Sequence, residues 1–303
     1  MPRETAIYVE RTSESPHFGP IQRTRELIAH RHLLWNLSSR DLKVKYASSL
    51  LGAVWSALNP LVYLLAFTVI FSLILPSGVP NFPIYLFCGL IAWNFFASSL
   101  GLGARSVVDN ANLVKKVYFP REFLPLAAVN AAGVDLAVQT VILIGFLIVL
   151  RYPFLGPNVL LVPLSLLALV VFTAAMTLLV AALNVRYRDV QHLLNVLLLL
   201  WFWFTPIVYP SGLIYTKLAG RTLFGIPLFN LFLLNPVADV VLGLQRGLYA
   251  KVAPGDPPVL VLPPVSLGWL ASVISVTAIL STLLLWYTWR RFFLLSGDFA
   301  EEL

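Results

Sequence analysis

Long apolar stretches alternate along this chain with short segments that carry nearly all of its charge. No Asp, Glu, Lys or Arg occurs in residues 47–104, 152–185, 190–216 or 257–289. A helix needs about 20 mostly apolar residues to cross the hydrocarbon core of a bilayer. Each stretch therefore predicts at least one transmembrane helix, and none shows the alternating polarity that is typical of membrane-barrel strands.

The boundaries of these stretches predict an all-α polytopic membrane protein with six transmembrane helices. We place the six spans near residues 53–75, 83–104, 123–150, 157–185, 190–210 and 265–289. The apolar segment 222–238 is short and is broken by Gly225, Pro227 and Pro236. Irregular backbone is tolerated at membrane depth where it is buried in protein. We therefore expect short re-entrant helices between the fifth and sixth spans.

Apolar and basic residues alternate at helical spacing before the first span. Leu27, Ile28, Leu34, Trp35 and Leu42 recur in this way among arginines and lysines, which predicts an amphipathic helix on the inner membrane surface. The expected organisation is a flexible tail over 1–20, this interface helix over 21–50, a transmembrane domain over 51–290 and a C-terminal tail over 291–303.

Composition and charge agree with a membrane protein and give its orientation. The chain is 59% hydrophobic and 12% charged, whereas a soluble domain is about a quarter charged. Of its 21 lysines and arginines, 16 fall on the side of the predicted spans that holds both termini. The positive-inside rule places that side in the cytoplasm. The net charge of +7 is thus explained without nucleic acid, and the single Cys88 is expected to be a packed core residue.

Sequence motifs for catalysis are missing. The chain contains no phosphate-binding G-x-x-x-x-G-K-[ST], C-x-x-C, H-E-x-x-H or G-x-S-x-G. The four histidines lack the spacing of metal ligands, and the acidic residues of the loops stand apart. We therefore expect a transport protein with no metal site and no cofactor of its own, in preference to a membrane enzyme.

Three segments resemble the permease subunits of type 2 ABC exporters. They are RDLKVKYASSLLGAVWSALNP (40–60), NANLVKKVYFPREFLPL (110–126) and NVRYRDVQHLL (184–194). The most similar group exports polysaccharides such as O-antigen, teichoic acid and galactan. The resemblance implies a homodimer with two copies of a separate ATPase, which binds ATP and Mg. It also implies export of a polyprenyl-pyrophosphate-linked polysaccharide across the inner membrane of a bacterium.

The same resemblance assigns the charged segment at residues 112–122 to coupling with the ATPase. Basic residues would give charge complementarity and aromatic residues would anchor the contact, while a proline would break the helix. The residues concerned are Asn112, Lys115, Lys116, Tyr118, Phe119, Pro120, Arg121 and Glu122. A second inner turn holds Arg186, Arg188 and Asp189, which either contact the ATPase or only set orientation.

The substrate path has three candidate parts. Arg40, Lys43 and Lys45 would attract the lipid pyrophosphate at the inner entrance, or anchor ordinary anionic headgroups. Aromatic residues would stack on sugar rings, or form an interfacial belt. The channel and outer gate would comprise Tyr63, Trp93, Trp201, Trp203, Phe204, Tyr209, Leu231 and Leu244.

Two further points stay open in the sequence. Asp135 is an acid deep within a predicted span, and Gln139 one turn away could bond it. A structural hydrogen bond between spans is the favoured interpretation of this acid. Proton coupling by this acid is the less favoured interpretation. The substrate is also open, because an exporter of drugs or small lipids would share the fold. A membrane enzyme of glycan assembly is a more distant alternative.

Overall fold

The computed structural model describes residues 19–46, 55–74, 76–117, 119–218, 220–249 and 260–303. Most of these residues are helical. The strands in this part of the chain form one short antiparallel hairpin, β1 (Thr222–Leu223) and β2 (Ile226–Pro227). The hairpin turns at Phe224 and Gly225, which both have positive φ angles. The fold class is therefore the predicted all-α polytopic membrane protein, with one small hairpin added.

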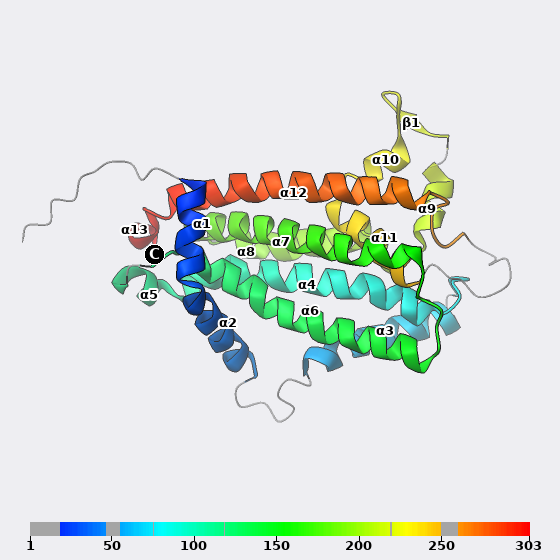
Figure 1. Cartoon of the computed structure of the whole chain (residues 1–303), viewed down its shortest axis with the longest axis horizontal. Coiled ribbons are helices and arrows are strands. Elements are labelled where there is room, and N and C mark those ends of the chain that lie inside the picture. The colour runs from blue at the N-terminus through cyan, green and yellow to red at the C-terminus, as the bar shows by residue number, and fades with distance from the viewer. Residues whose placement is uncertain (1–18, 47–54, 75, 118, 219, 250–259) are drawn as a thin grey trace, which may run out of the picture.

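Four long helices run side by side along the long axis of the molecule (Figure 1). They are α4 (Phe82–Asp109), α6 (Phe123–Val149), α7 (Leu161–Arg186), preceded by the 3-10 turn η3 (Pro157–Leu160), and α12 (Leu267–Leu295). Among the described residues, these helices are long and apolar enough to cross a membrane. They correspond to the second, third, fourth and sixth predicted spans. α4 and α12 extend about a turn and a half beyond their predicted ends.

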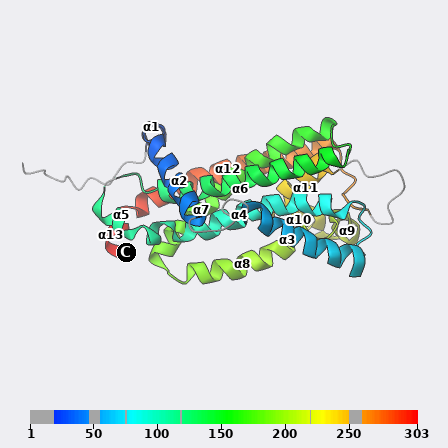
Figure 2. The ribbon, with the colours of Figure 1, turned by 90° about the horizontal axis from the view of Figure 1, so that it is seen from below.

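The first and fifth predicted spans form shorter apolar helices on one side of the bundle. They are α3 (Trp55–Val69), which continues into the π-helical turn η2 (Ile70–Ile74), and α8 (Val190–Phe204). Figure 2 shows α8 along one edge of the molecule. The rings of Phe67 and Phe202 stack with centroids 6.3 Å apart and join the two helices. Six membrane crossings therefore remain a prediction, because four helices in the described part of the chain have the full length.

Short helices lie at both ends of the bundle (Figure 1). The end that we call the α5 end holds α1 (Pro20–Ala29), α2 (Arg31–Tyr46), α5 (Ala111–Lys116) and α13 (Phe299–Glu302). The opposite end, which we call the α9 end, holds α9 (Ser211–Leu218), the hairpin and α10 (Leu228–Phe232). The predicted interface helix is thus two helices, and residues 1–18 of the predicted tail lie outside the described part.

The short helix α11 (Pro236–Leu248) is buried between α4, α7 and α12. Asn235 caps its start, since the Asn235 side chain accepts hydrogen bonds from the backbone amides of Val237 and Ala238. Gly243 allows close packing, because a Cβ atom there would lie 2.0 Å from the Ser165 hydroxyl. Its polar residues Asp239 and Gln245 are buried along with its apolar ones, so protein surrounds the helix on nearly all sides. α11 is therefore part of the core.

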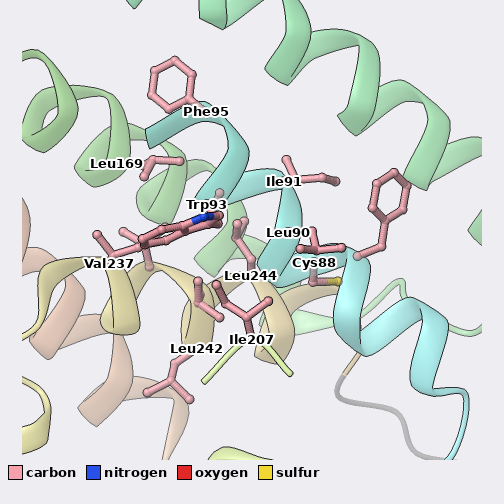
Figure 3. Close-up of a cluster of buried hydrophobic side chains, with 14 of the residues drawn as sticks. Cys88, Leu90, Ile91, Trp93, Phe95, Leu169, Ile207, Val237, Leu242 and Leu244 are labelled. Carbon is pink, nitrogen blue, oxygen red and sulfur yellow. The ribbon is translucent and has the colours of Figure 1, made fainter. Parts of the chain in front are cut away.

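Two hydrophobic clusters stabilise the bundle. The larger one surrounds α11 and the middle of α4, where Cys88, Trp93 and Leu244 lie together (Figure 3). Cys88 is fully buried, as its place in an apolar stretch predicts. The smaller cluster lies at the α5 end, where Phe299 of α13 packs edge-on against Phe292 of α12. The C-terminal tail is thus folded onto the bundle.

Candidate functional site

A charged pocket opens between α2, α4 and α6 near the α5 end. Its cavity measures about 450 Å³. Three of its lining side chains are basic, and the lining residues are Arg40, Asp41, Val44, Lys45, Leu102, Arg105, Ser106, Asp109, Asn110, Ala128 and Ala131. Basic groups that converge in this way suit a compact anion with several oxygen atoms, because hydrogen bonds between charged groups are the strongest kind.

The position of α2 brings the basic residues into this pocket. Ser38 is buried, and its hydroxyl accepts from the Asn130 side-chain amide at 3.0 Å. The hydroxyl donates to the Leu34 carbonyl at 2.9 Å and also lies 3.4 Å from the carbonyl oxygen of Ala127 on α6. Further along both helices, Lys45 forms an ion pair with Asp135. The contacts thus advance along α6 by about two turns. α2 thus packs along the first half of α6, at the edge of the bundle (Figure 1).

The two arginines of the pocket hold weak, exposed ion pairs. Arg40 donates from Nε and Nη2 to the Asp41 carboxylate at 3.1 and 2.8 Å. The Nε atom of Arg105 lies 3.9 Å from the Asp109 carboxylate, and all four side chains are a third or more exposed. Exposed ion pairs of this kind stabilise a fold by at most about 1 kcal/mol. Both guanidinium groups can therefore turn toward a bound anion at small cost.

The partners of Asp135 and Gln139 differ from the sequence expectation. The Asp135 carboxylate accepts from the Lys45 ammonium at 2.5 Å, and the amide of Gln139 accepts instead from the side chain of Asn94 at 3.1 Å. The predicted bond between Asp135 and Gln139 is thus replaced by two links to other helices. Asp135 thus joins two helices, but its partner helix is α2 and not one of the predicted spans.

The structure divides the predicted entrance residues. Arg40 and Lys45 line the pocket, whereas Lys43 is exposed and does not line it. Arg105 lines the pocket too, although sequence reasoning did not single it out. The sequence did contain a signal for it: Arg105 lies four residues before Asp109 at the end of a predicted span, and this spacing allows an ion pair on one face of a helix.

An aromatic groove of about 380 Å³ lies further along α4, between α3 and α8. It is lined by Tyr63, Phe67, Leu90, Trp93, Asn94, Ala97, Leu198, Leu199, Phe202 and Trp203. Trp93 contacts the edge of Phe202 with ring centroids 5.4 Å apart. Tyr63 and Trp203 are more than half exposed. Flat aromatic faces beside the Asn94 amide suit a ligand that has both apolar faces and hydroxyl groups, as sugars do.

Trp201 lies outside this groove, although it was predicted beside Trp203. Its ring packs edge-on against Phe96 and Phe172, and its indole nitrogen donates to the side-chain carbonyl of Asn235 at 2.8 Å. Trp201, two positions before Trp203, therefore points away from the groove and joins α8 to the start of α11.

The other predicted channel residues are also dispersed. Leu244 is 3% exposed within the core, so its side chain does not reach a channel from this position (Figure 3). Leu231 is half-buried in α10, and Phe204 is 69% exposed at the end of α8. The Tyr209 hydroxyl donates to the Trp203 carbonyl at 2.7 Å. Of these four, only Phe204 has a widely exposed side chain.

The charged segment predicted for coupling forms α5 and the turn after it. Asn112, Lys115 and Lys116 are exposed, while Val114 is buried in the cluster at the α5 end. Phe119 is half-buried against the same cluster. Pro120 and Arg121 are also half-buried, and Tyr118 lies outside the described residues. α5 therefore has a buried side that fixes it and an exposed basic side.

Glu122 does not lie on that exposed side. Its residue is 0% exposed, and its carboxylate accepts from the indole nitrogen of Trp289 at 3.4 Å. Trp289 belongs to α12, so this contact joins the start of α6 to the last long helix. In the isolated chain, Glu122 therefore holds the turn after α5 against α12 and is not accessible to a partner.

The second charged turn, between α7 and α8, remains fully on the surface. Arg186, Arg188 and Asp189 are exposed, and the Arg186 guanidinium lies 5.8 Å from the centre of the Tyr187 ring. The described residues also contain no group of three or more His, Cys, Asp or Glu side chains that could hold a metal ion.

Comparisons with known proteins point to a family of membrane transporters. Residues 32–219 match the family model of the ABC-2 type transporter. The chain is 35% identical over 258 residues to the O-antigen export system permease protein RfbA of Myxococcus xanthus, with 84% of this chain and 95% of that protein covered. It is 32% identical over 210 residues to the protein of the same name in Klebsiella pneumoniae, with 69% and 77% covered.

Proposed function

Because the chain belongs to the ABC-2 type transporter family, we propose that it is the membrane-channel subunit of an ATP-driven exporter of a lipid-linked polysaccharide. The names of the relatives specify O-antigen export, and this polymer class is the substrate that we propose here. The chain would perform transport only. ATP and Mg would bind a separate ATPase subunit.

The observation that carries this proposal is the presence of two different sites along one helix. α4 contributes Arg105 to the charged pocket and Trp93 and Asn94 to the aromatic groove. A polyprenyl-pyrophosphate glycan has the same two parts, an anionic headgroup followed by sugars. Basic groups would bind the first part, and aromatic faces would stack on the second. A drug or a small lipid would need no such pairing.

A second copy of the chain is the proposed partner for the α3 and α8 side. This side exposes large apolar residues on both helices, namely Leu61, Val62, Leu65, Leu193, Val196, Leu197 and Leu200. Two copies that meet there would bring two aromatic grooves together. The groove of one copy would then form one wall of a channel between the subunits.

The ATPase would contact the exposed side of α5. Lys115 and Lys116 would supply complementary charge there, and Phe119 would supply an apolar anchor. This assignment puts the α5 end and both termini in the cytoplasm, as the positive-inside rule predicts. In a bacterium the protein would lie in the inner membrane with six spans. α3 and α8 would complete the six, while α10 and α11 would be the re-entrant segment.

Reconstituted vesicles test the function directly. The permease and its ATPase, purified together, should export a polyprenyl-pyrophosphate glycan when ATP is added, and hydrolysis should rise with this substrate. ATPase activity that responds to drugs but not to the glycan would favour the small-molecule alternative. Glycosyl transfer by the permease alone, without an ATPase, would instead identify an enzyme.

Thiol labelling tests the orientation. Phe224 in the hairpin is 96% exposed and Lys116 in α5 is exposed, whereas the native Cys88 is buried. A cysteine in place of Phe224 should react with an impermeant reagent from outside the cell. A cysteine in place of Lys116 should react only after the membrane is opened. The opposite pattern would reverse the proposed orientation.

A further inference from the structure

The ion pair between Lys45 and Asp135 is unusual for its depth. Asp135 lies 12 residues after Phe123, the first residue of α6, and a helix rises about 1.5 Å per residue. The pair is thus about 18 Å along a helix that is long enough to span the membrane. An acidic side chain at such depth normally faces protein or a wet cavity and has a partner.

The two members of the pair face different surroundings. Lys45 lines the charged pocket and its side chain is 39% exposed, whereas Asp135 is not among the lining residues and its side chain is 11% exposed. The carboxylate therefore lies behind the ammonium as seen from the pocket. An ammonium group has three hydrogen-bond donors, so Lys45 can bind Asp135 and a ligand in the pocket together.

The pair also lies next to the aromatic groove. Gln139 is one turn beyond Asp135 on α6, and it bonds the side chain of Asn94, which lines the groove. A row of polar side chains thus leads from the innermost base of the charged pocket to the amide of the groove. A headgroup held at Lys45 would place the first sugar close to Asn94.

We propose that Asp135 is a positioning residue that fixes Lys45 as the innermost contact for a lipid pyrophosphate. Arg40 and Arg105 would bind the same headgroup nearer the opening, where their own ion pairs are exposed. The headgroup would thus be drawn along α6 to the level of Asp135 before the glycan enters the groove. This inference rests on the proposed function. It adds how deep in the bundle the headgroup would bind and names Asp135 as the residue that would position Lys45 there.

Exchanging the two charges tests the inference, because it separates stability from ligand binding. The double variant Lys45→Asp with Asp135→Lys keeps an ion pair but puts the carboxylate on the pocket side. We expect the purified complex with its ATPase, in lipid nanodiscs, to keep its thermal unfolding midpoint. Its Kd for polyprenyl pyrophosphate should weaken by about tenfold or more, the loss expected when a charge pair becomes repulsive.

Matched single variants complete the test. Lys45→Gln should weaken the same Kd by about tenfold, while Lys43→Gln, on the same helix but outside the pocket, should leave it within about twofold. If the exchanged pair does not assemble, Lys45→Arg decides, since it keeps the cation and should retain binding that Lys45→Gln loses. Equal binding by these two variants would overturn the inference.

Other outcomes would also overturn it. If the charge-exchanged variant has both the stability and the binding of the native protein, the ion pair has a purely structural role. Equal losses in the Lys43 and Lys45 variants would indicate diffuse attraction to the surface. Inorganic pyrophosphate that competes as well as the lipid form would assign the pocket to a soluble anion, and polyprenyl alcohol should not compete.

Export by the unaltered complex is measured first in the same preparation. If the native complex exports glycan and the variants bind polyprenyl pyrophosphate as tightly as it does, this inference is wrong but the proposed function stands. A native complex that neither binds polyprenyl pyrophosphate nor exports glycan would remove the proposed function itself.

Discussion

At the α9 end, phenol and amide side chains donate to backbone carbonyls, whereas at the α5 end many polar side chains are charged. Tyr152 donates to the carbonyl of Tyr249 at 2.8 Å, and Gln245 donates to that of Pro206 at 3.0 Å. Burial raises the pKa of Tyr152 to about 12, so this phenol stays protonated at physiological pH. These bonds are neutral and depend little on charge elsewhere in the protein.

The α5 end is joined by groups that respond to charge. Lys45 pairs with Asp135, and the buried carboxylate of Glu122 accepts from Trp289. Hydrogen bonds to charged groups are stronger than neutral ones, but losing one partner costs more. The comparison teaches that the α9 end is fixed largely by shape and by neutral donors, since even the buried carboxylate of Asp239 accepts from the hydroxyl of Thr277 at 2.7 Å. The α5 end has the charged groups that a phosphate ligand or an ATPase could act upon.

The largest effect should come from placing a charge in the core near the α9 end. Leu244→Asp would bury a carboxylate among Cys88, Ile91 and Leu143, where a charge without a partner costs more than about 4 kcal/mol. We expect the variant to be lost from the membrane fraction. Leu231→Asp, at a half-buried position of α10, is the matched control and should assemble. Normal, monodisperse Leu244→Asp protein would show that α11 is not part of the core.

Glu122→Ala should have the next largest effect, because it removes the acceptor of Trp289 at the α5 end. We expect a loss of about 1–3 kcal/mol in the free energy of unfolding together with weaker co-purification of the ATPase. The double variant Lys115→Ala with Lys116→Ala should weaken co-purification without changing stability, since both lysines are exposed. Unchanged stability of Glu122→Ala would place this residue at the partner contact.

Asn235→Ala should have a similar or smaller effect at the α9 end. The side chain caps α11, accepts from Trp201 and donates to Thr205, so its loss should cost about 1–2 kcal/mol. Asn235→Ser restores the cap but not the contact with Trp201, and its thermal midpoint should fall between those of the alanine variant and the native protein. Identical midpoints for the serine and alanine variants would show that the cap does not contribute to thermal stability.

Trp203→Ala should change stability least, within about 0.5 kcal/mol, because the side chain is 53% exposed. Export of the glycan should nevertheless fall severalfold if Trp203 forms part of the path. Trp201→Ala should show the reverse order, with a clear loss of stability, because its ring is packed and bonded. Equal stability losses in the two variants, measured by thermal unfolding, would contradict the division that the structure makes between them.

The sequence determined which parts of the chain form membrane helices. Runs without charge can be stable in lipid only as helices, so the four long helices could be predicted to within about two turns. The same reasoning found Arg40, Lys45, Tyr63, Trp93 and Trp203, because charge and aromatic character belong to the residues themselves. The resemblance to a family added the segment around α5.

Only the tertiary structure decided which of these residues share a site. Lys43 and Lys45 are equivalent in charge and spacing, yet the packing of α2 on α6 turns only Lys45 into the pocket. Trp201 and Trp203 differ by two helical positions, so they point to different neighbours once α8 is placed. Glu122 and Asp135 found partners on helices far away in sequence, Trp289 and Lys45. Such pairings depend on how helices cross, which the local pattern of a chain does not specify.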